Sequence, residues 1–195
     1  LLAAAFIAIA TVPLLILGYW VKETAMEKEL AAVSEKHLLL AQNVTAALDR
    51  YALDTKAAFV FFTESSTGEQ TSPAMVEMAR ELGFRHLGII DETGRVISRL
   101  DITGSIGDLL SAQTLTRLRP YISDTGVAFS DVMADADGRA TVYLVHRLGP
   151  GRVAIGALGL EYVRKLQKSI AFGHKGHSAI VDGRGNLLAH PNPEW

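Results

Sequence analysis

The sequence predicts an α+β protein in which long helical segments at the N-terminus precede an antiparallel sheet. Three observations carry this prediction. Residues 23–65 contain neither Gly nor Pro, residues 85–160 consist of short apolar runs separated by turn residues, and one hairpin pattern occurs twice. Because the two copies lie about ninety residues apart, we expect one complete module followed by the beginning of a second.

The repeated hairpin occupies residues 89–98, with the sequence IIDETGRVIS, and residues 180–189, with the sequence IVDGRGNLLA. Each copy reads as an apolar strand, an Asp-x-x-Gly reversal and a second apolar strand. Asp opens such a turn because its carboxylate accepts the backbone N–H two residues further on. Gly closes it because the chain needs a positive φ there. The second copy runs directly into His190-Pro191.

Residues 173–191 combine these features in the order Gly-x-x-Gly, strand, Asp-x-x-Gly, strand, His-Pro. In this they resemble the start of the membrane-proximal half of a double Cache domain, and the resemblance extends more loosely back to Leu87. Such domains are the extracytoplasmic, PAS-like sensors of bacterial chemoreceptors, sensor histidine kinases and cyclic-dinucleotide enzymes. The resemblance implies a membrane-distal PAS-like module over residues 66–164, with a five-stranded antiparallel sheet, and the start of a membrane-proximal module over residues 165–195.

Residues 1–21 carry no charge, and Lys22 is the first ionisable residue. About 20 apolar residues cross a bilayer as a helix, and Tyr19-Trp20 stands where interfacial aromatic side chains are common. The alternative is a cleaved signal peptide, but the apolar run continues well beyond the Ala-x-Ala pattern at residues 8–10. We therefore expect a transmembrane helix over residues 1–21. The family resemblance, and not a charge bias, places the residues after this helix on the periplasmic side of a bacterial inner membrane.

Residues 22–65 predict one long amphipathic helix, because apolar residues recur at steps of three and four for about five heptads. The apolar seam consists of Met26, Leu30, Val33, Leu40, Val44, Ala47, Tyr51, Ala58 and Phe61. His37 and Asp54 fall in the same seam as polar positions. We expect the second half of this helix to cover a sheet and the first half to form a homodimer contact with a second copy.

The segment after residue 65 predicts a PAS-like order of elements. Ser72 is expected to cap a short helix that begins at Pro73 and stops at Gly83. Further helices are expected at residues 109–119 and 161–170, and strands at residues 85–90, 95–100, 127–133, 139–148 and 153–160. Two strands alone are marginal in water, so we expect the natural protein to continue beyond the second hairpin, into a return membrane helix and a cytoplasmic output domain.

Composition and motifs argue against several functional classes. A net charge of −2 gives no basic field for nucleic acid, and the absence of cysteine excludes disulfides and thiol chemistry. A metal site would have to combine His174, His177, His190 and Asp182, but the first two histidines lie in a glycine-containing turn. The acidic run from Asp131 to Asp137 lacks the closing Glu of a calcium loop. No phosphate-binding loop or nucleophile elbow occurs.

We therefore expect neither catalysis nor a cofactor in this chain, although a missing output domain could be a kinase or a cyclase. The alternative is a membrane-anchored extracellular enzyme or adhesin-like domain that senses no ligand.

The resemblance also implies a small-molecule pocket between the sheet and the helical insertion after its second strand. Amino-acid-binding members grip the ligand carboxylate with a Tyr and an Arg-x-Trp, and the ammonium with an Asp at the end of the last strand. Here the insertion offers Arg117, Arg119 and Tyr121 without a tryptophan, and Glu161 takes the position of the Asp. The expected ligand is an organic acid or an amino acid, held by Arg119 and Glu161 from opposite sides of one cavity. The alternative for both arginines is a solvated helix face.

Three further residues are candidates for lining this pocket, namely Asp131, Tyr143 and His146. Strand alternation puts Tyr143 and His146 on opposite faces, so at most one of them can point into the pocket.

Overall fold

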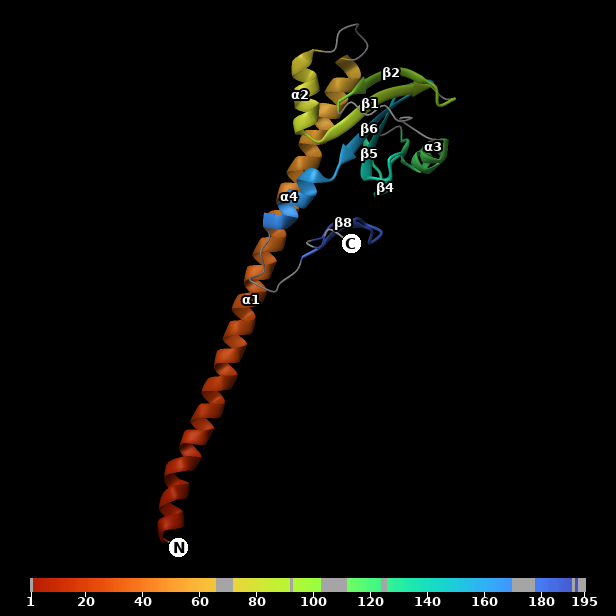
Figure 1. Cartoon of the computed structure of the whole chain (residues 1–195). Coiled ribbons are helices and arrows are strands. Elements are labelled where there is room, and N and C mark those ends of the chain that lie inside the picture. The colour runs from red at the N-terminus through yellow and green to blue at the C-terminus, as the bar shows by residue number, and fades with distance from the viewer. Residues whose placement is uncertain are drawn as a thin grey trace. The chain divides into compact units, whose positions relative to one another are not determined.

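The computed structural model describes residues 2–65, 72–91, 93–102, 112–123, 126–169, 178–190 and 192, without the side chains of residues 2–9, 101 and 112. It forms two compact units, Leu1–Ala47 and Leu48–Trp195. The elements are labelled in Figure 1.

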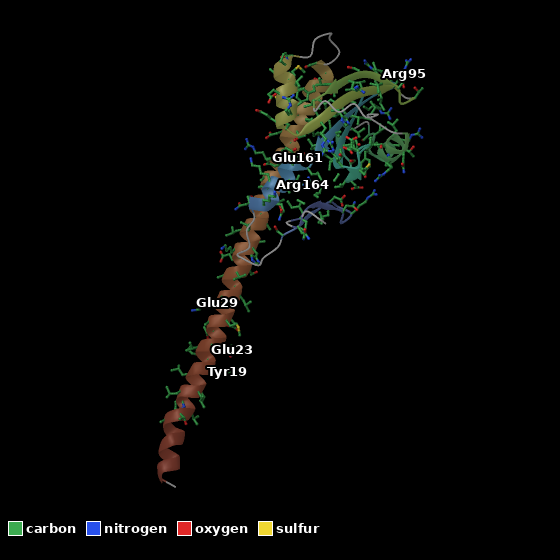
Figure 2. All side chains as sticks on the ribbon, in the orientation of Figure 1. Tyr19, Glu23, Glu29, Arg95, Glu161 and Arg164 are labelled. Atoms are coloured by element: carbon green, nitrogen blue, oxygen red, sulfur yellow. The ribbon has the colours of Figure 1, made fainter. Side chains whose placement is uncertain are left out.

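The first unit is the N-terminal part of helix α1, which runs from Leu2 to Ser65. Its described side chains, such as those of Tyr19, Glu23 and Glu29 (Figure 2), are largely solvent-exposed. Met26, Leu30 and Val33 are exposed as well. Within the described part of the chain, no helix contains an apolar stretch long enough to cross a membrane. The anchor expected over residues 1–21 stays a prediction.

The second unit is built on a six-stranded antiparallel sheet with the order β2-β1-β6-β5-β3, in which β4 also pairs with β5. Its elements are α2 (Pro73–Glu81), β1 (Phe84–Asp91), β2 (Val96–Asp101), α3 (Ala112–Leu118), η1 (Arg119–Tyr121), β3 (Ala128–Phe129), β4 (Met133–Ala134), β5 (Ala140–Gly149), β6 (Arg152–Gly159) and α4 (Glu161–Ser169). A separate two-stranded hairpin, β7 (Ile180–Val181) and β8 (Leu187–Ala189), comes next in the chain. The predicted α+β, PAS-like fold class is confirmed.

The strand expected at residues 127–133 is instead two short strands separated by a bulge. Phe129 pairs with Leu144 and Met133 with Thr141, so one extra residue lies on the outer strand. Ser130 causes the break: its N–H donates to the carbonyl of Tyr143 at 2.8 Å, and its Oγ accepts the N–H of Tyr143 at 2.9 Å. A side chain thus replaces the backbone acceptor, and the strand is interrupted at the following residue.

One face of the sheet packs against α2 and the C-terminal part of α1 (Figure 1). Phe59 and Phe62 on α1 are buried, and their rings lie 6.2 and 6.1 Å from the ring of Phe84. Phe59 also covers Gly156, where an added Cβ would lie 2.9 Å from the phenyl ring. Glycine at position 156 therefore lets the helix approach the backbone of the sheet.

The packing side chains of α1 coincide with the predicted seam at Tyr51 and Ala58 but depart from it near the end of the helix. Phe61 is 52% exposed, whereas Phe59 and Phe62 are buried. A straight helix has 3.6 residues per turn, so its buried stripe drifts by about 20° per heptad from a strict seven-residue repeat. By position 61 the buried stripe has left the seam. The prediction that the second half of the helix covers the sheet is confirmed, with Tyr51 and Ala58 of the seam in contact with the core, but near the end of the helix Phe59 and Phe62 provide the contact in place of Phe61.

The opposite face of the sheet packs against α3 and η1. Tyr143, Val145 and Ile155 from β5 and β6 are buried there together with Leu118, the last residue of α3. Burial raises the pKa of the Tyr143 phenol to about 12. This face is the one that the helical insertion covers, as expected from the order of elements.

The two Asp-x-x-Gly turns have the same geometry. Asp91 Oδ1 accepts the N–H groups of Thr93 and Arg95, and Asp182 Oδ1 accepts those of Arg184 and Asn186, all at 2.8–2.9 Å. The closing glycines have φ of 87° and 83°. The turn that joins β4 to β5, which begins at Asp135, repeats this pattern.

Asp182 is expected to titrate at unusually low pH. The side-chain hydrogen bond from Asn186 and the backbone N–H groups of Asn186, Arg184 and Val132 lower its pKa from 3.8 to about 2, against an opposing effect of burial. Because the folded pKa lies below the unfolded one, the ionised carboxylate favours the hairpin above pH ~4 and this contribution is lost as the pH falls toward 2. Carbon-13 NMR of the Asp182 carboxyl group measures the midpoint. Asn186→Ala should raise it, and a midpoint near 4 in the unchanged chain would contradict the geometry.

Candidate functional site

A hollow of about 350 Å³ lies where α3 and η1 meet the bulge between β3 and β4. Its lining consists of Arg117, Pro120, Tyr121, Asp131, Val132, Met133, Arg184 and Asn186. The first three come from the helical insertion, the next three from the bulged outer strands, and the last two from the turn between β7 and β8.

Local structure explains why these insertion residues face the hollow. Leu118 is fully buried and fixes the end of α3 on the sheet. Arg117 and Tyr121 are four residues apart and so lie on one side of the helical segment, whereas Arg119 lies on another side. The bulge likewise turns a residue of the outer strand toward the hollow, because the interruption at Ser130 leaves Asp131 next to Tyr121.

Asp131 is the centre of the polar contacts in this hollow. Its Oδ2 accepts the hydroxyl of Tyr121, and its N–H donates back to the same hydroxyl oxygen at 3.3 Å. Arg184 Nε lies 2.7 Å from the same Oδ2. The carboxylate is 23% exposed, and the Arg184 side chain is 73% exposed. The arrangement therefore offers one acidic group for a cation or hydroxyl donor, with the Arg117 guanidinium available in the same hollow.

The sequence led us to expect Arg119 and Glu161 on opposite sides of one cavity, but the structure places them in two different hollows. Arg119 lines a second hollow of about 300 Å³, together with Asp91 and Arg147. Glu161 lines a third hollow of about 500 Å³ at the start of α4. The reason is that Arg119 projects from a side of η1 different from Tyr121, and that Glu161 is held by an arginine of β1.

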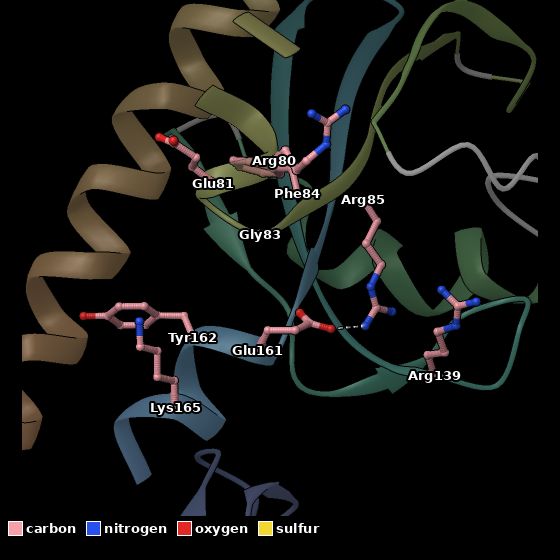
Figure 3. A pocket seen from close by; sticks show the side chains of 9 residues that line it. All are labelled: Arg80, Glu81, Gly83, Phe84, Arg85, Arg139, Glu161, Tyr162 and Lys165. Carbon is pink, nitrogen blue, oxygen red and sulfur yellow. Dashed lines mark hydrogen bonds and ion pairs between the residues drawn. The ribbon is translucent and has the colours of Figure 1, made fainter. Parts of the chain in front are cut away.

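That arginine is Arg85, shown with Glu161 in Figure 3. It was not among the residues predicted from the sequence. Its Nη2 lies 3.1 Å from Glu161 Oε1, and its Nη1 lies 3.0 Å from Asp135 Oδ2. The Arg85 side chain is only 11% exposed and that of Asp135 only 8%. Burial alone would raise the pKa of Asp135, but hydrogen bonds to its carboxylate and the charge of Arg85 hold it below its usual value. This cluster ties β1 to the β4–β5 turn and to α4, which is a structural role.

Tyr143 and His146 lie on opposite faces of β5, as predicted. Tyr143 is buried beneath η1, on the face that the insertion covers. His146 lies two residues after Leu144 and therefore on the same face of β5, the face that packs on α1. Its Nδ1 is buried and makes no hydrogen bond within the described residues. His146 therefore does not belong to the hollow around Asp131.

Among the residues whose side chains are described, no group of three His, Cys, Asp or Glu is placed to hold a metal ion. His174 and His177 lie outside those residues.

No protein-family model matches the sequence, and no curated protein matches it. Among the solved structures that match the chain are two ligand-binding domains. The ligand-binding domain of the Campylobacter jejuni chemoreceptor Tlp3, in complex with L-norvaline, has 10% sequence identity and a TM-score of 0.53, over 80% of this chain and 68% of that one. The ligand-binding domain of the Pseudomonas fluorescens chemoreceptor CtaA, in complex with L-isoleucine, has 15% identity and a TM-score of 0.48, over 80% and 66%. The first likeness establishes that the chain has the fold of a chemoreceptor ligand-binding domain.

Proposed function

We propose that this chain is the extracytoplasmic ligand-sensing part of a membrane receptor, and that it binds an amino acid or a related small carboxylate. The observation that carries the proposal is the hollow around Asp131. It places an acid, a phenol and an arginine between the helical insertion and the sheet, in a fold shared with a domain that binds L-norvaline.

The chemistry of the hollow suits a ligand with two opposite charges. The Arg117 guanidinium is suited to a carboxylate, which it can bind through two parallel hydrogen bonds. Asp131 and the hydroxyl of Tyr121 are suited to an ammonium group. A volume of about 350 Å³ is at the lower end of the range for small-molecule sites, which favours a ligand of amino-acid size.

A thermal-shift screen of the complete ectodomain against amino acids, carboxylates and amines tests this function. We expect at least one carboxylate to stabilise the protein. Arg117→Gln should then weaken its binding about tenfold, or ~1.4 kcal/mol, because a charge-assisted contact is lost. Arg164→Gln removes an exposed arginine of α4 outside the hollow (Figure 2) and should leave the affinity unchanged. Arg119→Gln should also have no effect. A ligand whose affinity survives both Arg117→Gln and Asp131→Asn would refute this location.

We also propose that the chain forms a homodimer through the N-terminal half of α1, anchored in the inner membrane by residues 1–21. Support comes from the seam of the first unit, where Met26, Leu30 and Val33 are half or more exposed. Apolar side chains repeated at heptad spacing favour pairing with a second helix.

Single cysteines test this dimer without interference, because the chain contains no cysteine. Leu30→Cys and Val44→Cys, both in the seam, should form disulfides between subunits in membranes. Glu35→Cys lies on the outer side of the same helix by heptad position and should not. Equal cross-linking at Leu30 and Glu35, or none at either seam position, would exclude this contact.

A further inference from the structure

The turn of the second hairpin contacts the candidate site directly. Arg184 Nε lies 2.7 Å from Asp131 Oδ2, and Asp182 Oδ2 accepts the N–H of Val132 at 3.3 Å. Two neighbouring residues of the bulge are therefore bound by two residues of one four-residue turn. At its other end, the hairpin is attached to α4, where the buried Gln167 donates to the carbonyl of Ser178 at 3.0 Å.

Asp131 consequently has two uses. It is the acidic group that the site offers to a ligand, and it is also the residue that holds the tip of the second hairpin. A ligand ammonium within hydrogen-bonding distance of Asp131 Oδ2 would lie within a few ångströms of the Arg184 guanidinium. Two like charges at that separation repel each other, and Oδ2 already binds both the Tyr121 hydroxyl and Arg184.

The Arg184 guanidinium and a ligand ammonium should bind Asp131 with similar free energies. The Arg184 side chain is mostly in solvent, so its ion pair with Asp131 is of the weak, exposed kind. A ligand that gains further contacts from Arg117 can therefore displace it. The turn itself does not depend on Arg184, because Asp182 organises it through the N–H groups of residues 184 and 186. Losing the ion pair leaves the turn folded and removes one of its two contacts with the bulge, the other being the hydrogen bond from the Val132 N–H to Asp182 Oδ2.

We infer that Arg184 is an internal competitor for Asp131, and that a ligand bearing an ammonium group loosens the attachment of the second hairpin to the site by taking its place. This inference rests on the proposed function and extends it, because it names the ammonium as the signal-bearing part of the ligand. Occupancy of the first module is thereby passed to the start of the second, through exchange of one cation for another on a single carboxylate.

The test uses three probes that differ by one group each: L-norvaline, pentanoate, which lacks the ammonium, and butylamine, which lacks the carboxylate. Binding to the full chain is measured by calorimetry. Arg184→Gln should tighten L-norvaline and butylamine by about two- to fivefold, because an exposed ion pair no longer competes. Pentanoate should bind unchanged. Arg164→Gln, the matched control, should alter none of the three.

A second readout monitors the hairpin itself. Spin labels are placed at Gln113→Cys, on the exposed side of α3, and at Gly183→Cys, where an added Cβ meets no atom within 4 Å. The distance distribution between them should be narrow in the parent protein. It should broaden with Arg184→Gln, with Asp131→Asn and with L-norvaline, but not with pentanoate or with sodium chloride at equal ionic strength.

The two proposals fail in different ways. If no probe or screened compound binds, the proposed function fails, and so does the exchange, even where Arg184→Gln broadens the distribution. If L-norvaline binds with an affinity that Arg184→Gln leaves unchanged, and the label distance does not respond to it, the inference fails while the sensing function stands.

Discussion

Phe59→Ala is expected to lower the free energy of unfolding of the second unit by about 3–5 kcal/mol, the usual cost of deleting a buried phenyl ring. Phe59 is fully buried, its ring lies 6.2 Å from that of Phe84, and it rests on Gly156. The cavity left by the substitution would separate α1 from the sheet and cannot close without moving the helix. Thermal unfolding followed by circular dichroism should show a decrease in Tm of roughly 10 °C or more.

Phe61→Ala is the matched control, because it deletes the same ring two residues further along the same helix. Phe61 is 52% exposed, so its removal should change stability by about 1 kcal/mol or less. Comparing the two substitutions shows whether α1 packs through the face seen in the structure, which contains Phe59, or through the heptad seam, which contains Phe61. Equal destabilisation by the two substitutions would mean that α1 is rotated about its axis, away from the packing of Phe59 on Gly156.

Arg85→Met should destabilise the second unit by about 3 kcal/mol. The methionine retains most of the length of the side chain but leaves the carboxylate of Asp135, 8% exposed, without its cation. Breaking a buried ion pair from one side typically costs 3–5 kcal/mol. The lower value is expected here because Asp135 keeps its hydrogen bonds from the N–H groups of residues 137 and 139 and from Thr141.

The same substitution should shift acid unfolding to higher pH. The pKa of Asp135 is held below its ordinary value, so its ionised form contributes stability above the unfolded pKa and loses that contribution as the pH falls through the folded pKa. Without Arg85, the pKa of Asp135 in the folded protein rises, so the loss of stability begins at a higher pH. Arg95→Met is the control, since Arg95 pairs with Asp91 on an equivalent turn but is 83% exposed. It should cost less than 1 kcal/mol, and similar effects at both sites would show that burial of the Arg85 cluster is not important.

Local sequence signals predicted the local structure well. Ser72, Pro73 and Gly83 bound α2 as expected, with Ser72 accepting the N–H of Ala74 at 3.2 Å. Both Asp-x-x-Gly turns formed. These features depend on contacts within a few residues, so the amino acids that specify them stand together in the sequence.

Features that depend on distant partners were not predictable in the same way. The strand at 127–133 looked continuous because the role of the Ser130 hydroxyl depends on its alignment with Tyr143. Arg85 was missed because its partner Asp135 lies 50 residues away. For the site, the family resemblance had named Arg117, Tyr121 and Asp131 as candidates, and the structure places all three around one hollow. It could not reveal that Arg119 faces a different hollow, since that depends on how η1 is seated on the sheet.

A crystal structure of the complete ectodomain with the ligand found by the thermal-shift screen tests the central claim most directly. The proposed function predicts ligand density in the hollow between η1 and the β3–β4 bulge, with its carboxylate at Arg117 and a donor group at Asp131. For a ligand with an ammonium, Arg184 should have left Asp131. Ligand density beside Arg119 and Arg147, or in the hollow at Glu161 and Arg85, would contradict the proposed site.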